Sequence, residues 1–247
     1  MWINNISTEQ PQAHQAFSSL EAVFALEGEV VTKSGLCTVT RVMLDNRTYY
    51  IKKYQRSGEG LSVLAILSKA RREWSNLLTF SQWGLPAAQL AAYGEQPRWK
   101  FPRKAVVITR GIDSAPDLAQ LYKENAAELR DPQWVRAVSS QVAHATRVMH
   151  QHNFAHNDWK WRNILVRNTP NGPEMFMIDC PAGQRWPWPF FEYRRVKDLA
   201  CLDKVANKVL SRTQRLRFYL EYCQRQRLNE EDKAVIRKIT GFFKGRE

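Results

Sequence analysis

The segment HNDWKWRN, residues 156–163, decides the fold of this chain. Within it, Lys160 follows Asp158 by two positions, and Asn163 follows Asp158 by five. Phosphoryl transfer needs a carboxylate that accepts the proton of the attacking hydroxyl, and a cation that offsets charge on the phosphoryl group. It also needs Mg²⁺, which prefers carboxylate and amide oxygens as ligands. Alternatively, these residues and His156 only satisfy a polar turn, but four residue types at these spacings favour the chemistry.

A second carboxylate lies further along the chain. The aliphatic run 164–166 follows the segment directly, and the apolar run 175–178 ends in Asp179, about sixteen positions after Asn163. Short apolar runs of this kind predict strands. We therefore expect Asn163 and Asp179 to supply oxygen ligands for Mg²⁺.

The flanking segments predict an α+β fold with two lobes. Runs rich in β-branched and aromatic residues predict strands at 22–28, 37–45, 48–54, 89–96 and 103–110, with a basic turn at 98–103 and a helix at 61–80. Helical spacing predicts helices at 116–129, 132–152, 194–210, 213–225 and 229–243. Because strands and helices are segregated, we expect an N-terminal lobe over residues 1–112 and a C-terminal lobe over residues 113–247, together one domain.

The composition indicates a folded protein with an anionic partner. The 247 residues are 44% hydrophobic and 25% charged, which excludes a disordered chain and a disulfide-rich miniprotein. The net charge is +13, with +8 on residues 51–112 and +8 on residues 181–247. Such a charge favours a phosphorylated small molecule, an anionic membrane or nucleic acid, although it can also serve solubility alone. No nucleic-acid-binding module is recognisable, so we expect no nucleic-acid partner.

Several features are typical of a cytoplasmic protein. The four cysteines lie far apart without a CxxC pair, which favours reduced thiols and gives no zinc signature. The first fifteen residues lack the basic and apolar regions of a secretory signal. No apolar run reaches the about 18 residues that a membrane span needs. We expect a cytoplasmic protein, either free or peripheral at the inner face of the cytoplasmic membrane.

These motifs resemble the protein-kinase-like superfamily and, within it, the bacterial lipopolysaccharide kinases: the Kdo and heptose kinases of the inner core, with the InaA-type proteins. The resemblance covers about residues 37–223 and rests on TYYIKKY, ARREW, HNDWKWRN, MIDCPAG and RRVKDLACL. It implies a bilobal kinase that uses ATP and Mg²⁺ to phosphorylate a heptose or Kdo hydroxyl. Two alternatives remain open: a nucleotide-binding stress or regulatory protein with weak or no transfer, and a protein kinase.

The resemblance also assigns roles in the C-terminal lobe. Asp158 matches the catalytic base, and Asn163 and Asp179 match the Mg²⁺ ligands. Lys160 is the cation expected beside the phosphoryl group. Asp198 matches a buried aspartate that braces the catalytic loop.

In the N-terminal lobe, Lys52 matches the lysine that clamps the α- and β-phosphates, and Glu73 matches the helix glutamate that pairs with it. Lys53 is a rival one position away. Because neighbouring strand residues face opposite ways, only one of the two lysines can face the nucleotide, and we favour Lys52.

The sequence departs from the superfamily pattern in two places. The motif GxGxxG is absent, and Gly28 and Gly35 instead flank VVTKS, so the phosphates would be held by a looser loop or by Lys33 and Ser34. Cys180 and Pro181 follow Asp179 in place of Phe-Gly, which argues against switching through that phenylalanine and is compatible with a pseudokinase.

The aromatic segment RWPWPFFEY, residues 185–193, follows where a kinase places its substrate-facing segment. Aromatic residues beside basic ones suit a membrane interface or the face of a sugar. Alternatively, Trp186, Trp188 and Phe190 pack the segment onto the C-terminal lobe. The basic stretches 212–217 and 225–227 likewise form either a solvated face or a contact with an anionic leaflet.

Overall fold

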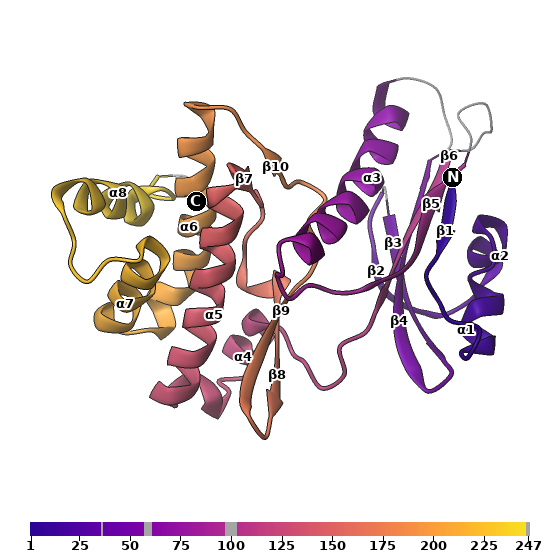
Figure 1. Cartoon of the computed structure of the whole chain (residues 1–247), viewed down its shortest axis with the longest axis horizontal. Coiled ribbons are helices and arrows are strands. Elements are labelled where there is room, and N and C mark those ends of the chain that lie inside the picture. Colours follow the sequence, from indigo (N-terminus) through magenta and orange to yellow (C-terminus); the bar gives the residue numbers. More distant parts are fainter. Residues whose placement is uncertain (36, 57–60, 97–102, 246–247) are drawn as a thin grey trace. The chain divides into compact units, whose positions relative to one another are not determined.

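The strand-forming residues of the first part of the chain build one antiparallel sheet in the computed structural model, which describes residues 1–35, 37–56, 61–96 and 103–245 (Figure 1). The strand order is β1-β5-β6-β4-β3-β2. The strands are β1 (Trp2–Asn4), β2 (Glu29–Lys33), β3 (Cys37–Leu44), β4 (Arg47–Arg56), β5 (Leu90–Glu95) and β6 (Arg103–Arg110). The helices α1 (Pro11–Ala16), α2 (Leu20–Ala25) and α3 (Leu61–Gln82) complete this unit, Met1–Asp113.

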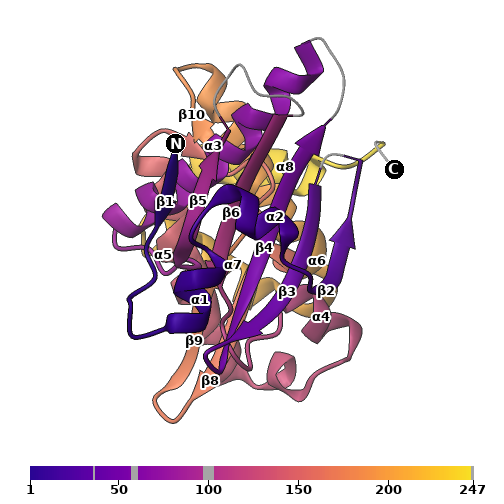
Figure 2. The same cartoon turned by 90° about the vertical axis from the view of Figure 1, so that its right-hand side faces the viewer.

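Alternation along β4 gives the sheet two different faces. Tyr49 and Ile51 are fully buried in a cluster with Phe17 and Val23, which come from the segments of α1 and α2. The ring of Phe17 meets that of Tyr49 edge to face, with the centroids 5.2 Å apart. Figures 1 and 2 show α1 and α2 over one face of the sheet and α3 over the other. Side chains of β4 therefore alternate between the α1/α2 side and the α3 side.

The second unit, Ser114–Glu247, is mainly helical. Its helices are α4 (Leu118–Lys123), α5 (Pro132–Gln151), α6 (Phe190–Val209), α7 (Arg212–Cys223) and α8 (Glu230–Gly241), with 3-10 turns η1 (Ala127–Arg130) and η2 (Trp161–Asn163). Two antiparallel strand pairs complete it, β8 (Ile164–Thr169) with β9 (Gly172–Met177), and β7 (Phe154–Ala155) with β10 (Gln184–Arg185). Capping boxes begin α7 and α8, at Ser211 with Gln214 and at Asn229 with Asp232.

The prediction of an α+β fold is confirmed, but three elements differ from those expected. Residues 22–28, predicted as a strand, include most of α2. The Ser19 hydroxyl accepts a hydrogen bond from the backbone N–H of Ala22 and caps the N-terminus of this helix. The helix predicted over 116–129 is broken into α4 and η1, with Asn125 in a left-handed conformation between them. The basic turn expected at 98–103 lies almost wholly outside the described residues.

The third element that differs from the prediction is helix α6, whose first residues belong to the aromatic segment 185–193. Helix α6 begins at Phe190, four residues earlier than predicted, so Phe190 and Tyr193 belong to its first turn.

Among the described helices, none combines the length and the hydrophobicity that crossing a bilayer requires.

Candidate active site

The N-terminal unit contributes one buried carboxylate with two donors. Lys52 Nζ donates to Glu73 Oε1 at 2.5 Å, and Tyr54 Oη donates to Glu73 Oε2 at 2.5 Å. Lys52 and Tyr54 lie two positions apart on β4 and therefore share the face that α3 covers. The side chain of Glu73 is 2% exposed and that of Lys52 is 20% exposed. The carboxylate is thus fixed from both sides, and it holds the lysine ammonium in place.

Lys53 points to the opposite face of β4. Its Nζ donates to the backbone carbonyl of Leu26 at 2.6 Å, just beyond α2, and more weakly to that of Phe24 at 3.4 Å. Burial lowers the pKa of this lysine. Strand alternation therefore separates Lys52, beside Glu73, from Lys53, beside α2.

The two glycines expected in the phosphate loop lie at the ends of the β2 segment. Gly28 is exposed, and a Cβ there would lie 2.6 Å from Val42 Cγ1 and 2.8 Å from the carbonyl oxygen of Arg41. Glycine at this position therefore lets the chain pass close to β3. A Cβ on Gly35 would meet nothing within 4 Å, so packing does not require glycine there.

In the second unit, the segment 156–163 alternates between buried and outward-facing side chains. Trp159 is fully buried, and its Nε1 donates to Thr146 Oγ1 of α5 at 2.8 Å. Trp161 Nε1 donates to the carbonyl oxygen of Leu202 on α6 at 3.1 Å. The two tryptophans thus fasten the loop to two helices, and the partly exposed side chains of Asp158, Lys160 and Arg162 lie on its outer side.

Those outer residues converge on one carboxylate. Lys160 Nζ lies 2.5 Å from Asp158 Oδ1, and Arg162 Nη2 lies 2.8 Å from Asp158 Oδ2. Burial acts to raise the pKa of Asp158, but the hydrogen bonds and positive charges of Lys160 and Arg162 outweigh it, and the pKa lies below its usual value. The carboxylate is therefore ionised at neutral pH and can accept a hydrogen bond from a hydroxyl.

A backbone hydrogen bond joins the segments that carry Asn163 and Asp179. The Asn163 amide nitrogen donates to the carbonyl oxygen of Asp158 at 2.7 Å and to Asp158 Oδ2 at 3.3 Å. The backbone N–H of Ile178, immediately before Asp179, donates to the carbonyl oxygen of Asn163 at 3.1 Å. Asp179 itself has φ of 57°, a left-handed conformation that is uncommon outside glycine.

Asp198 braces the loop from α6, as expected. It is fully buried and accepts hydrogen bonds from the backbone N–H groups of His156 at 2.7 Å and Asn157 at 2.9 Å. The ring of His156 is also fully buried and lies 5.0 Å from that of Trp159. Burial lowers the pKa of His156, against the opposing effect of the Asp198 charge. A neutral imidazole therefore packs beneath the loop.

A short connection fastens the chain after Asp179 to the same loop. Gln184 pairs with Ala155 in the β10–β7 ladder, and Asn157 Nδ2 donates to the carbonyl oxygen of Ala182 at 2.9 Å. A Cβ on Gly183 would lie 2.4 Å from Cys180 Sγ and 2.6 Å from Phe154 Cζ, so only glycine fits this crossing.

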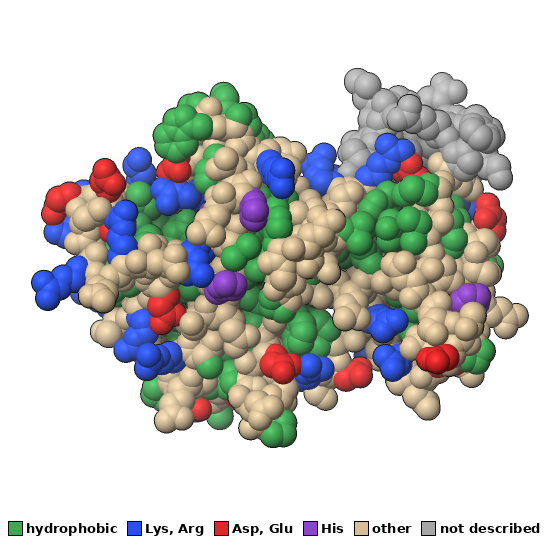
Figure 3. All heavy atoms as spheres, in the orientation of Figure 1, with side chains coloured by type: hydrophobic (Ala, Val, Ile, Leu, Met, Phe, Trp, Pro, Cys, Tyr) green, Lys and Arg blue, Asp and Glu red, His purple; other side chains and the backbone are tan. Residues whose placement is uncertain are grey.

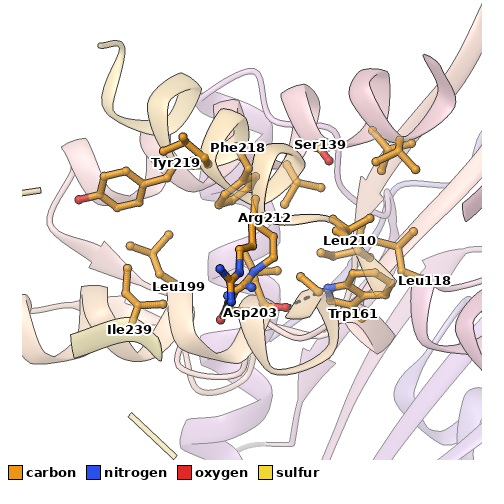
Figure 4. Close-up of a pocket in the computed structure, with 18 of the residues that line it drawn as sticks. Leu118, Ser139, Trp161, Leu199, Asp203, Leu210, Arg212, Phe218, Tyr219 and Ile239 are labelled. Atoms are coloured by element: carbon orange, nitrogen blue, oxygen red, sulfur yellow. Dashed lines mark hydrogen bonds and ion pairs between the residues drawn. The ribbon is translucent and has the colours of Figure 1, made fainter. Parts of the chain in front are cut away.

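An apolar cavity of about 450 Å³ lies behind the loop, among helices α4 to α8 (Figure 4). Trp161 and Leu118 line it on one side, and Tyr219 and Ile239 line it on the other. Among its few polar lining groups, Arg215 binds Asp203 through two hydrogen bonds of 2.7 and 2.8 Å. In the described residues, no group of three or more His, Cys, Asp or Glu side chains could hold a metal ion, inside this cavity or elsewhere.

Sequence reasoning missed two of these contacts. The spacing of Asp158 and Arg162, one helical turn apart, could have indicated their ion pair. Nothing in the sequence indicated that Tyr54 binds Glu73, because this contact depends on how β4 packs against α3.

Comparison with known proteins places the chain in a family. The model of the lipopolysaccharide kinase (Kdo/WaaP) family matches residues 21–222, most of the chain. The solved structure of WaaP in complex with acyl carrier protein is similar in fold, with a TM-score of 0.73 and 21% identity over 99% of this chain and 95% of that one. No curated protein matches the sequence. The chain therefore belongs to the lipopolysaccharide kinase (Kdo/WaaP) family and is an ATP-using phosphotransferase of the lipopolysaccharide core.

Proposed function

We propose that this kinase transfers the γ-phosphoryl group of ATP to a heptose or Kdo hydroxyl of the lipopolysaccharide inner core. The observation that carries the proposal is the cluster around Asp158, whose ionised carboxylate lies 2.5 Å from Lys160 Nζ on a loop that buried tryptophans hold rigid. Catalysis of phosphoryl transfer depends mainly on positioning and on charge stabilisation, and both are supported here.

Asp158 is the group that accepts the proton of the sugar hydroxyl in this proposal. Its lowered pKa keeps it ionised, and its contacts with Lys160 and Arg162 orient both carboxylate oxygens. When a nucleotide is bound, the Lys160 ammonium would offset the charge of the moving phosphoryl group.

Asn163 and Asp179 fit the requirements of Mg²⁺. They offer amide and carboxylate oxygens, which a hard cation prefers, and Mg²⁺ commonly takes one or two protein ligands with phosphates and waters completing its shell. The hydrogen bond from the Asn163 amide nitrogen to Asp158 turns the amide oxygen away from that contact. The left-handed backbone of Asp179 is the kind of local strain that accumulates at functional sites. The cation would neutralise charge on the nucleotide phosphates.

The first unit, Met1–Asp113, acts in this proposal as the nucleotide clamp. Lys52 holds the α- and β-phosphates, and Glu73 fixes the position of the lysine. Gly28 and Gly35 flank the β2 strand that would lie over the phosphates. Residues 114–247 supply the catalytic loop, the metal ligands and the side that receives the acceptor.

The proposal is tested by measuring ATP consumption against a panel of core oligosaccharides, lipids and proteins. We expect phosphorylation of an oligosaccharide that contains heptose or Kdo, and its loss in Asp158→Ala. Asp203→Asn, a carboxylate change in the same unit but outside the loop, is the matched control and should retain activity. Turnover of protein acceptors alone, or none with any acceptor, would contradict the proposal.

A second proposal concerns the apolar cavity behind the loop. Its volume of about 450 Å³ lies within the roughly 300–1,000 Å³ typical of small-molecule sites. The similar WaaP is solved in complex with acyl carrier protein, a class of protein that carries fatty acyl chains. We propose that an acyl chain, delivered by such a partner, occupies this cavity, where Trp161 of the catalytic loop would contact it.

Mass spectrometry of lipids extracted from the purified protein tests this second proposal. We expect a bound fatty acyl species in the wild type, and its loss in Ala206→Trp, which places a large ring among the lining residues. Wild-type protein that carries no acyl species and shows no thermal shift with palmitate or with an acylated carrier protein would refute it.

A further inference from the structure

Three large aromatic side chains at the start of α6 are exposed to solvent. Trp188 is 72% exposed, Phe190 is 64% exposed and Tyr193 is 52% exposed. We call these three residues the aromatic ridge. Figure 3 shows hydrophobic side chains gathered over this end of α6. Large apolar side chains that stay exposed together in the folded protein indicate an interaction site, because their burial against a partner would remove apolar surface from water.

The position of Trp186 differs from that of Trp188 and Phe190, although the sequence pattern groups the three residues. The backbone N–H of Trp186 donates to the carbonyl oxygen of Asn153 at 2.9 Å. The guanidinium of Arg194 lies 4.4 Å from the centre of the Trp186 ring. Trp186 therefore packs the segment onto its own unit, whereas Trp188 projects from it.

The surroundings of the ridge are basic. Residues 185–197 contain four basic side chains and one acidic side chain, a net charge of +3. The single acid, Glu192, is paired with Arg195 at 2.6 Å, and Arg185, Arg194 and Lys197 are the other three basic residues that give the segment its positive charge. Aromatic side chains with basic neighbours are the combination that favours the interface of an anionic bilayer.

The ridge is held at a fixed place relative to the catalytic loop within the second unit. Gln184 and Arg185 pair with Ala155 and Phe154, directly before the loop that contains Asp158. At the other end, the ring of Tyr193 lies 5.5 Å from that of Phe242, beyond α8. A surface that engages the ridge would therefore set the position of the catalytic loop relative to that surface.

We propose that the aromatic ridge and its basic neighbours dock the protein on an anionic lipid bilayer. The inference rests on the proposed function in one respect: lipopolysaccharide is a lipid-anchored acceptor, so the kinase meets it at a bilayer. Trp188 and Phe190 enter the interface, and Arg185, Arg194 and Lys197 contact anionic headgroups.

The binding test uses co-sedimentation with vesicles of phosphatidylglycerol and phosphatidylethanolamine, and with vesicles of phosphatidylcholine alone. We expect binding to the anionic vesicles at 0.1 M salt and a loss of at least tenfold in Trp188→Ala/Phe190→Ala. The basic contribution should weaken at 1 M salt, where the Debye length falls from about 10 Å to about 3 Å. Met43→Ala is the matched control, because Met43 is also 72% exposed but lies on β3.

Insertion is measured separately by fluorescence quenching with brominated lipids. The wild type should be quenched, and Trp188→Phe should lose part of that quenching while it still binds. Because the ridge is exposed, these variants should keep the wild-type melting temperature. Wild type that does not sediment with anionic vesicles would overturn the proposal, and so would equal binding by the double variant. A change from dimer to monomer in the double variant, without lipid binding, would assign the ridge to a second copy instead.

Activity separates this proposal from the proposed function. Transfer to a delipidated, soluble core oligosaccharide should be unchanged in the ridge variants, whereas transfer to a vesicle-embedded acceptor should fall. Loss of vesicle binding with both activities intact would contradict the docking role. Absence of transfer in the wild type would contradict the proposed function and leave the vesicle measurements to decide on the ridge.

Discussion

Lys52 and Lys53 are neighbours on β4, yet their ammonium groups lie on opposite faces of the sheet. Lys52 Nζ is 2.5 Å from Glu73 Oε1 on the α3 side, and Lys53 Nζ is 2.6 Å from the carbonyl oxygen of Leu26 on the α2 side. Two identical side chains, one position apart, therefore have different environments and allow a matched comparison.

Lys52→Ala should weaken ATP binding, because it removes the cation that the proposal assigns to the phosphates. Lys53→Ala should leave ATP affinity near that of the wild type, although it removes a partly buried side chain from the α2 side. Isothermal titration calorimetry with ATP measures both. If Lys53→Ala proves the more sensitive variant, the phosphate clamp must be reassigned.

Asp158→Ala should lower turnover by roughly 10²–10⁴, the range that positioned acid–base groups contribute. ATP affinity should change little, since the carboxylate is assigned to the sugar hydroxyl and not to the nucleotide. Steady-state rates and ATP titrations on the same preparation separate the two effects. A parallel loss of affinity and turnover would place Asp158 in nucleotide binding.

Asp179→Asn should weaken Mg²⁺-dependent ATP binding at least tenfold, because the substitution removes the negative charge of a metal ligand while it keeps a side chain of similar shape. Asparagine also tolerates the left-handed backbone found there, so the variant isolates the charge from the conformation. Titration of ATP with and without MgCl₂ provides the measurement. Equal affinity in both conditions for the wild type would show that Asp179 does not act through a metal.

Much of the catalytic loop was predictable because its residues are close in sequence. The spacing of Asp158, Lys160 and Asn163 was visible directly, and the structure brings the three side chains into contact. Their catalytic roles stay predictions. The anchoring function of Trp159 and Trp161 was not predictable. It depends on hydrogen bonds to Thr146 on α5 and to Leu202 on α6, and these contacts form only when the two helices pack against the loop.

Other parts of the fold could not be predicted, because they depend on tertiary packing and not on the local preference of residues for helix or strand. The run at residues 22–28 has β-forming residues, but the Ser19 cap and the burial of Leu20 and Val23 favour a helix. Strand β1 has only three residues, and its pairing with β5 joins segments about ninety residues apart, so the sequence pattern gave no signal for it.

Asp198→Asn should lower the free energy of unfolding by about 1–3 kcal/mol, the cost of leaving one buried donor unsatisfied. The carboxylate accepts two backbone N–H groups, from His156 and Asn157, whereas an amide offers only one oxygen. Urea denaturation gives the change from the midpoint and slope. Asp203→Asn, on the same helix and paired with the partly exposed Arg215, should cost less. An equal effect of the two substitutions would show that Asp198 does not brace the loop.

Arg162→Ala should move the acid limb of the pH–rate profile to higher pH. Burial raises the pKa of Asp158, and the hydrogen bonds from Lys160 and Arg162 more than offset this, so removing Arg162 raises the pKa of the carboxylate. In the proposed mechanism turnover requires the ionised form of Asp158, so the acid limb of the kcat profile should report this ionisation in the enzyme–substrate complex. Because the folded-state pKa lies below that of the unfolded chain, the ion pairs stabilise the fold above about pH 4, and this contribution is lost as the pH falls through the folded-state value. The variant should therefore lose less stability than the wild type on acidification.

Arg167→Ala, which removes the pairing of Arg167 with Glu174 on the β8–β9 hairpin, is the matched control and should leave the acid limb unchanged. An acid limb that stays in place in Arg162→Ala, or that moves equally in both variants, would show that the limb does not report Asp158.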